Sequence, residues 1–329
     1  MALSSSMVNI VADIGGTNLR IGMLDDTGVV KNLHLYQCAE FSGLQVVLED
    51  YFVQHQIDSS KVNACLAIAC PVDKDLISMT NLPWQFSQSE LKASLQLRSL
   101  YLINDYTAIA MSVNSLDDTQ KVKIGGGKAI AKKPIAICGP GTGLGVANLF
   151  EFQGQWISVG GEGGHVDFAP TDDDEVAILK FLKQKYPRVS AEQLLSGLGI
   201  EQIYQALCAL HQVQAQDYQA KDISAKGISG DCDICHQAMH QFCKTLGSFA
   251  GNLALTTGAF GGVYIAGGIV PRFLEFLAAS DFRSRFEAKG RFEAFNQSIP
   301  TYVITEPQPG ILGASAYLTQ QINNEVVCL

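Results

Sequence analysis

The sequence has few positive charges and no long apolar run. Its 329 residues include 23 Lys and Arg against 32 Asp and Glu, which gives a formal net charge of −9. This acidity leaves little long-range attraction for nucleic acid or anionic lipid. No run reaches the roughly 18 apolar residues of a transmembrane helix. The first residues have neither Lys nor Arg nor an apolar core, so they do not resemble a signal peptide. We expect a cytoplasmic protein that binds neither nucleic acid nor membrane.

The nine cysteines lack the dense spacing of a disulfide framework. An odd number scattered through apolar stretches of a long chain is typical of reduced thiols. One group, Cys232, Cys235, His236, His240 and Cys243, suggests a zinc site. The ends of this segment are about 16 Å apart along a helix, so four ligands within it cannot converge on one ion. We therefore favour a buried helix that contains small apolar cysteines.

Hydrophobic residues make up 47% of the chain, which is enough for a sizeable core and two lobes. A strand pattern enters a glycine-rich turn twice, and a second strand leaves it each time. The predicted strands around these turns are Val8–Asp13, Leu19–Leu24, Val29–Tyr36, Pro134–Cys138 and Val146–Phe150. The polar, locally basic segment 117–133 is our candidate for the passage between the lobes. Two similar halves that face each other would bring both turns to one cleft.

Helix signals lie between these strands. Capping boxes at 87–90 and 190–193 predict that a helix follows each of them. Apolar residues at helical spacing predict helices at Leu44–Gln54, Asp174–Lys185, Cys235–Leu255 and Gly313–Gln321.

The first glycine-rich turn is Asp13-Ile14-Gly15-Gly16-Thr17-Asn18. Glycines allow a close backbone approach to a phosphate and expose amide N–H donors. Thr17 and Asn18 add side-chain donors, and Asp13 is placed to hold Mg²⁺ through water. Taken alone, the motif is also compatible with a plain hairpin.

The second turn is Gly139-Pro140-Gly141-Thr142-Gly143-Leu144-Gly145. It is not a dinucleotide fingerprint, because that motif requires a glycine at position 144 or 146 and these hold Leu144 and Val146. It is not a P-loop either, since no Gly-Lys-Ser/Thr follows. A strand–turn–strand phosphate clamp fits better than a flexible loop.

Polar residues at two further places suggest a hydroxylated ligand. Asp105 follows Asn104 at the end of a predicted buried strand, where a carboxylate could accept the proton of an attacking hydroxyl. The alternative for such an Asp is a helix N-cap. Glu162 and His165 lie three residues apart on the loop 160–165, and both could bind vicinal hydroxyls. A metal site is the weaker interpretation of this loop, because few possible ligands lie within reach of one ion.

Two more residues have ordinary alternatives. Glu192 lies in a predicted first helical turn, where it could simply complement the helix dipole. Asn81 lies in the segment Met79-Thr80-Asn81-Leu82-Pro83-Trp84, which could be an exposed loop.

Six motifs, in this order, resemble those of the bacterial glucokinases, within the hexokinase, acetate kinase and actin-like ATPase superfamily. They are Asp-Ile-Gly-Gly-Thr-Asn at 13–18, Met-Thr-Asn at 79–81, Ile-Asn-Asp-Tyr-Thr-Ala at 103–108, Gly-Thr-Gly-Leu-Gly at 141–145, Gly-Glu-Gly-Gly-His-Val-Asp-Phe-Ala-Pro at 161–170, and Gly-Gly-Val-Tyr-Ile-Ala-Gly-Gly-Ile at 261–269. The resemblance runs from about Val8 to Leu318. The Cys-x-Cys-Gly zinc signature of the related repressor and kinase family is missing, which places the chain with the zinc-free glucokinases.

The resemblance implies an α/β, two-lobed actin-like ATPase (ribonuclease H-like) fold, each lobe a mixed sheet flanked by helices. The small lobe would comprise 1–115 plus about 305–329, and the large lobe 116–304. It implies ATP-dependent phosphorylation of D-glucose with Mg²⁺, by a homodimer whose lobes close on glucose. Asp105 would be the general base, and the glucose-binding residues would be Asn81, Asn104, Asp105, Glu162, His165 and Glu192. The nucleotide would be bound by Ala12, Asp13, Ile14, Gly15, Gly16, Thr17, Gly141, Thr142, Gly143, Gly267 and Gly268.

Two rivals remain. A kinase for mannose, fructose or N-acetylglucosamine is hard to separate from one for glucose, because the orientation of one hydroxyl depends on loop positions. A sugar-responsive repressor on the same fold should carry an N-terminal helix-turn-helix of some sixty residues, and the first predicted strand starts near Val8. We therefore consider the repressor the weaker rival.

Overall fold

Two mixed β-sheets organise the chain, each in its own unit. In the computed structural model, residues 7–79 and 82–327 are described. Unit 1 comprises Met1–Leu116 and Pro307–Leu329, and unit 2 comprises Asp117–Glu306. Mixed sheets flanked by helices confirm the expected α/β class.

The sheet of unit 1 has the strand order β3-β2-β1-β4-β7. The first three strands form antiparallel pairs, whereas β1, β4 and β7 run parallel to one another. Their bounds are Val8–Ile14 for β1, Asn18–Leu24 for β2, Val30–Gln37 for β3, Val62–Ile68 for β4 and Ser99–Asn104 for β7. Every residue of β4 is buried, as is usual for a strand with both faces covered.

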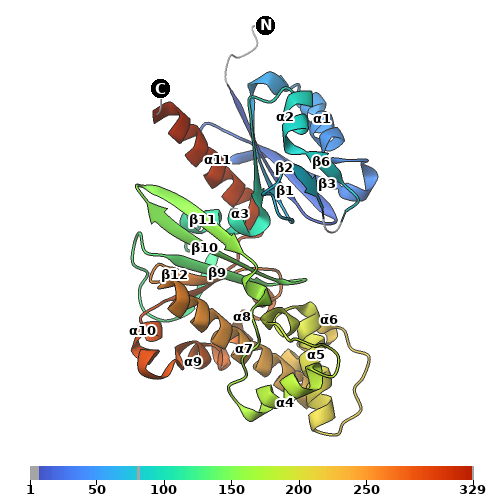
Figure 1. Ribbon diagram of the computed structural model, residues 1–329, viewed down its shortest axis with the longest axis vertical. Coiled ribbons are helices and arrows are strands. Elements are labelled where there is room, and N and C mark those ends of the chain that lie inside the picture. The colour runs from blue at the N-terminus through green and yellow to red at the C-terminus, as the bar shows by residue number, and fades with distance from the viewer. Residues whose placement is uncertain (1–6, 80–81, 328–329) are drawn as a thin grey trace. The chain divides into compact units, whose positions relative to one another are not determined.

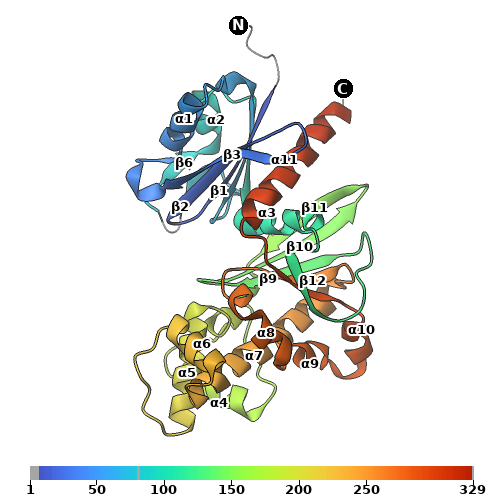
Figure 2. The ribbon, with the colours of Figure 1, turned by 180° about the vertical axis from the view of Figure 1, so that it is seen from behind.

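Helices cover both faces of this sheet. On one face pack α1 (Leu44–Gln54) and α2 (Gln88–Ser94), and on the other pack α3 (Asp105–Ser112) and α11 (Pro309–Val327) (Figures 1 and 2). Side chains alternate along β1, so Ile10 belongs to the first core and Val11 to the second. By the same alternation Asp13 lies on the α3 and α11 face. A separate hairpin pairs β5 (Leu76–Ser78) with β6 (Gln85–Ser87).

The sheet of unit 2 has the strand order β11-β10-β9-β12-β13-β8. Strands β9, β10 and β11 form an antiparallel meander, and β9, β12 and β13 run parallel. The bounds are Lys121–Gly125 for β8, Ile135–Pro140 for β9, Leu144–Phe152 for β10, Gln155–Gly161 for β11, Gly262–Ile265 for β12 and Thr301–Ile304 for β13.

The long helix α7 (Asp233–Thr257) forms the centre of the helical layer of unit 2 (Figures 1 and 2). It buries an apolar stripe and packs against α5, α6 and α9. The other helices are α4 (Asp173–Leu182), α5 (Gly197–Leu210), α6 (Ala220–Ser229), α8 (Leu274–Ala279), α9 (Phe282–Glu287) and α10 (Glu293–Gln297).

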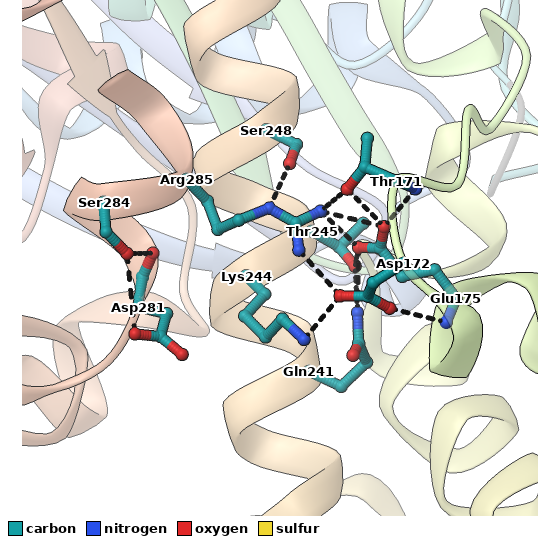
Figure 3. Close-up of polar contacts among 10 residues, drawn as sticks. All are labelled: Thr171, Asp172, Glu175, Gln241, Lys244, Thr245, Ser248, Asp281, Ser284 and Arg285. Carbon is teal, nitrogen blue, oxygen red and sulfur yellow. Dashed lines mark hydrogen bonds and ion pairs between the residues drawn. The ribbon is translucent and has the colours of Figure 1, made fainter. Parts of the chain in front are cut away.

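A cluster of charged side chains joins α4, α7 and α9 (Figure 3). The Arg285 guanidinium lies 2.9 Å from Asp172 and 2.8 Å from Glu175, and it also donates to Thr171. Lys244 from α7 forms a 2.6 Å ion pair with Asp172. The Glu175 side chain is only 1% exposed, so it depends on these partners for charge compensation.

Two local expectations were incomplete. The segment 117–133 is not simply a passage, because it contains β8, which pairs with β13 at the edge of the unit 2 sheet. An edge strand tolerates polar residues, which hid it from the apolar pattern. The capping box at Ser190 is present, but it starts only the short 3₁₀ helix Ala191–Gln193, and α5 begins separately with Ser196 as its N-cap.

Across the helices formed by the described residues, none combines the length and the apolar character that crossing a bilayer requires.

Candidate active-site residues

The first glycine-rich turn joins β1 to β2 as an antiparallel hairpin. The Gly15 N–H donates to the Asn18 carbonyl at 3.0 Å, and the Thr17 carbonyl accepts from the Cys38 N–H at 2.9 Å. Thr17 itself is exposed. Ala12 and Ile14 are completely buried strand residues. A ligand could therefore reach these two only through the backbone.

Asp13 points into the space near the start of α11. A Cβ added to Gly310 would lie 2.8 Å from the Asp13 carboxyl carbon, so only glycine allows this approach. Burial raises the pKa of Asp13, while Arg20, at 3.9 Å, opposes the rise. The carboxylate is thus only partly compensated by protein groups, which suits a cation or a phosphate-bound metal.

Asp105 is the first residue of α3, directly after the N-cap Asn104. The Asn104 side chain accepts from the Tyr106 N–H at 2.9 Å, so Asn104, rather than Asp105, is the N-cap. The pKa of Asp105 is raised from 3.8 to about 6, chiefly by burial; the Tyr106 N–H lowers it, and the charge of nearby Asp13 contributes to the rise. A carboxylate of this pKa is largely ionised at neutral pH and accepts a proton more readily than an ordinary aspartate.

The second glycine-rich turn lies between β9 and β10. The Gly141 N–H donates to the Gly143 carbonyl at 2.8 Å, and the Gly141 carbonyl accepts from the Gly197 N–H at 2.9 Å. The first residue of α5 therefore supports this turn. Thr142, at the tip, is exposed.

Glu192 contacts the second turn directly. Its Oε2 accepts from the Leu144 N–H at 2.9 Å, and a Cβ on Gly143 would lie only 2.5 Å from the same oxygen. Its Oε1 lies 4.0 Å from His165 Nε2. Glu192 thus contacts both the second turn, which lies 48 residues earlier in the chain, and the loop that carries His165.

The loop that carries Glu162 and His165 follows β11. Gly163–His165 forms a 3₁₀ turn, and both Glu162 and His165 are exposed. Arg188 fixes the loop from outside, since it donates to the His165 carbonyl at 2.5 Å and to Asp167 Oδ1 at 2.6 Å. Gly164 packs against the Leu144 carbonyl, where a Cβ would collide.

Gly267 and Gly268 follow β12. Gly267 has a φ of +84°, and a Cβ there would collide with the carbonyl of Pro140 in the second turn. A residue with a side chain would be strained and would clash at this position. The glycine therefore lets the end of β12 lie against the second turn.

The structure groups the sequence-predicted residues within each unit. In unit 1 it brings Asp13 close to Asp105, and in unit 2 it brings Glu192 close to His165 and the second turn. Asn81 lies outside the described residues. Sequence reasoning missed Arg188 and Gly310, because no local pattern shows which distant residue an arginine or a glycine will meet.

Within residues 7–79 and 82–327, no group of three or more His, Cys, Asp or Glu side chains is arranged to hold a metal ion. Mg²⁺ in phosphoryl-transfer enzymes is usually held by one or two carboxylates together with substrate phosphates. A single uncompensated carboxylate such as Asp13 is compatible with that type of site.

Comparison with known proteins identifies the family. The family model described as Glucokinase matches residues 10–321. A curated glucokinase of Colwellia psychrerythraea is 58% identical over 321 residues, covering 96% of this chain and 97% of that protein.

Solved structures agree. The crystal structure of a glucokinase from an Antarctic psychrotroph has a TM-score of 0.88 and 36% identity, covering 95% of this chain and 99% of that one. A glucokinase of the ROK family from Streptomyces griseus, solved in complex with glucose and AMPPNP, has a TM-score of 0.59 and 16% identity. The match covers 95% of this chain and 99% of that one, and at this identity it concerns the fold alone. The match over nearly the whole length shows that the chain belongs to the glucokinase family.

Proposed function

We propose that this chain transfers the γ-phosphoryl group of ATP to the 6-hydroxyl of D-glucose, the first step of glucose use in glycolysis. The observation that carries the proposal is the Asp105 carboxyl, whose pKa is about 6 because of burial and the nearby Asp13. Membership of the glucokinase family supports the substrate, and the AMPPNP bound to the Streptomyces protein supports ATP as the donor.

Asp105 acts as the general base. Its ionised side chain accepts the proton of the attacking hydroxyl as the O–P bond forms, and the resulting neutral carboxyl is well tolerated because burial already favours it. The N-cap bond of Asn104 to the Tyr106 N–H fixes the start of α3 and therefore the position of the carboxylate.

The two glycine-rich turns, together with the end of the strand before the first one, bind the phosphates. The residues proposed to take part are Ala12, Ile14, Gly15, Gly16 and Thr17 in unit 1 and Gly141, Thr142 and Gly143 in unit 2. Gly267 and Gly268 lie by the adenosine. Asp13 would hold Mg²⁺ through water, and the ion would supply positive charge that offsets the phosphate oxygens.

The glucose hydroxyls are bound by Asn81, Asn104, Asp105, Glu162, His165 and Glu192. Glu192 has already committed Oε2 to the Leu144 N–H, so Oε1 is the oxygen we assign to the sugar. Arg188 donates a hydrogen bond to the His165 carbonyl and so fixes the backbone from which the His165 imidazole extends. Asn81 enters this list by resemblance alone.

The finer description of the fold is part of the same proposal. We assign the two units to the small and large lobes of an actin-like, ribonuclease H-like ATPase, with functional boundaries at 1–115 plus about 305–329 and at 116–304. We also propose a cytoplasmic homodimer. Both points rest on the resemblance to bacterial glucokinases, and sedimentation at several protein concentrations tests the dimer.

A coupled assay with ATP and separate hexoses tests the activity. Glucose should give the highest kcat/KM, with glucose 6-phosphate as the product, and mannose, fructose and N-acetylglucosamine should give lower values. Turnover of another hexose without turnover of glucose would overturn the assignment of the substrate. No phosphorylation of any hexose would overturn the proposed reaction itself.

A further inference from the structure

Two cysteines meet at the first turn of α7. Cys232 is the N-cap of this helix, and its sulfur accepts a hydrogen bond from the Cys235 N–H at 3.3 Å. The Cys232 sulfur also lies close enough to the Cys235 thiol to raise its pKa, after the larger effect of burial. Helix geometry places Cα atoms three residues apart at about 5 Å, within the range of about 4.4–6.8 Å found in disulfides.

The two thiols differ in their exposure. Cys232 is partly exposed, whereas Cys235 is buried. Every other cysteine in the part of the chain that the structure describes is buried as well. A small oxidant in solution therefore has access to Cys232 before it can reach any of those thiols.

The surroundings favour attack at Cys232 followed by attack from Cys235. The sulfur of Cys232 is the more exposed of the two, and it lies at the N-terminus of a 25-residue helix, where it accepts a backbone N–H. Burial, and then the Cys232 sulfur beside it, raises the pKa of Cys235, so Cys235 stays protonated until its neighbour has reacted.

Packing holds this turn in place. Gly227 of α6 lies so close to α7 that a Cβ there would be 2.6 Å from the Cys235 carbonyl oxygen. The His236 Nδ1 pairs with the Gly227 carbonyl at 2.8 Å, which ties the next residue to the same helix. The pair is therefore preorganised by α6 and does not depend on a mobile loop.

We propose that Cys232 and Cys235 form a reversible dithiol–disulfide site that reacts with hydroperoxides. Cys232 sulfur attacks the terminal oxygen of the hydroperoxide, which breaks the O–O bond, gives a sulfenic acid and releases an alcohol, or water when the oxidant is hydrogen peroxide. Cys235 sulfur then attacks the sulfenic sulfur, the disulfide forms, and the hydroxyl leaves with the Cys235 proton as water. Two thiols are oxidised and one peroxide is reduced. A thiol reductant reverses the change by thiol–disulfide exchange.

Cys208 is the competing partner. It is buried on α5, close enough to Cys232 for the charge of that sulfur to raise its pKa, after the larger effect of burial. Cys208 lies on a different helix, whereas Cys235 shares a single turn with Cys232 and already contacts its sulfur. The short local connection favours the 232–235 bond.

The test uses the full chain, hydrogen peroxide as the oxidant and alkylation after denaturation. Reduced protein should take up nine alkyl groups, one for each cysteine, and oxidised protein nine minus two, or seven. Dithiothreitol should restore nine. Trypsin separates Cys208 from the pair because Lys221 and Lys226 lie between them, and chymotryptic cleavage after Phe242 removes Cys243. The peptide that retains Cys232 and Cys235 should be lighter by two hydrogen atoms.

Variants assign the two steps. Cys232→Ser keeps a good N-cap and should retain all eight remaining thiols under peroxide. Cys235→Ala should instead accumulate a sulfenic acid at Cys232 that dimedone traps. Cys243→Ala, on the same helix but buried elsewhere, should lose two thiols like the parent protein. A disulfide to Cys208 or Cys328, or only six thiols in oxidised Cys232→Ser, would overturn the proposal. Peptide mapping of the disulfide in the oxidised, unmutated protein decides the question even if a variant fails to fold.

Discussion

Replacing Asp105 by Asn should make the protein more stable and much less active. In the folded state the pKa of Asp105 is raised from 3.8 to about 6, chiefly by burial. Ionised Asp105 therefore destabilises the fold at neutral pH, and the neutral amide of Asn removes that cost. A rise of this size corresponds to about 3 kcal/mol. Because the charge of Asp13 contributes part of this rise in pKa, we expect a gain of about 1–3 kcal/mol in the free energy of unfolding.

The gain has a defined pH dependence. It is largest above about pH 7, where Asp105 is ionised both in the folded and in the unfolded chain. It falls to about half near pH 5, because the folded protein takes up a proton as the pH passes through about 6. It disappears below about pH 3.8, where the carboxyl is neutral in both states and resembles the amide.

Urea unfolding followed by circular dichroism, at about pH 8 and about pH 5 without nucleotide or Mg²⁺, measures the gain. Asp117→Asn is a control of opposite sign. Hydrogen bonds from Thr119 lower the pKa of exposed Asp117, so its replacement should decrease stability at about pH 8. Turnover of Asp105→Asn should fall at least about 10²-fold. A gain that does not change with pH would refute the burial argument, and near-normal turnover would refute the role as base.

Three other substitutions probe the rest of the chain. Gly143→Ala places a Cβ 2.5 Å from Glu192 Oε2, so kcat/KM for both ATP and glucose should fall about tenfold. Gly161→Ala is the control in the same assay: its Cβ meets nothing within 4 Å, so both values should stay unchanged. Arg188→Ala removes the hydrogen bond that holds the His165 loop. Steady-state kinetics should therefore show a KM for glucose raised about tenfold with a smaller change in kcat, and an unchanged KM would exclude a positioning role for Arg188. Arg285→Met leaves buried Glu175 without its main partner and should lower the free energy of unfolding by about 3–5 kcal/mol. The control Arg291→Met, at an exposed position, should lower it by less than about 0.5 kcal/mol, and urea unfolding measures both.

The strands around the two turns could be predicted because they depend on local pattern. Alternation of apolar residues marked β1, β2, β9 and β10, and the glycines between them marked the antiparallel reversals, which the structure confirms. Strand β8 could not be found this way, because an edge strand pairs on one side only and keeps polar residues. Helix α6 was missed too, because few of its residues are buried.

The roles of single residues were harder to predict, because they depend on partners far away in the chain. Sequence alone left Asp105 open between base and N-cap, and the structure assigns the N-cap to Asn104. It could not show that Gly310 must be small to make room for Asp13, almost three hundred residues earlier. The assignments of site residues stay predictions until the kinetics are measured.

Glu192 couples the two binding tasks that we assign to unit 2. One of its oxygens is fixed by the Leu144 N–H at the end of the second turn, and the other lies 4.0 Å from His165 in the proposed sugar-binding loop. A rigid carboxylate cannot move one oxygen without moving the other. A phosphate that orders the turn therefore also orders the sugar-facing oxygen, and a sugar that binds this oxygen restrains the turn. Since such coupling is reciprocal, we expect ATP to tighten glucose binding by the same factor as glucose tightens ATP binding. Calorimetric titration with AMPPNP measures the coupling factor, with Glu192→Ala as the uncoupled control, and the same factor in the variant as in the parent protein would exclude this route.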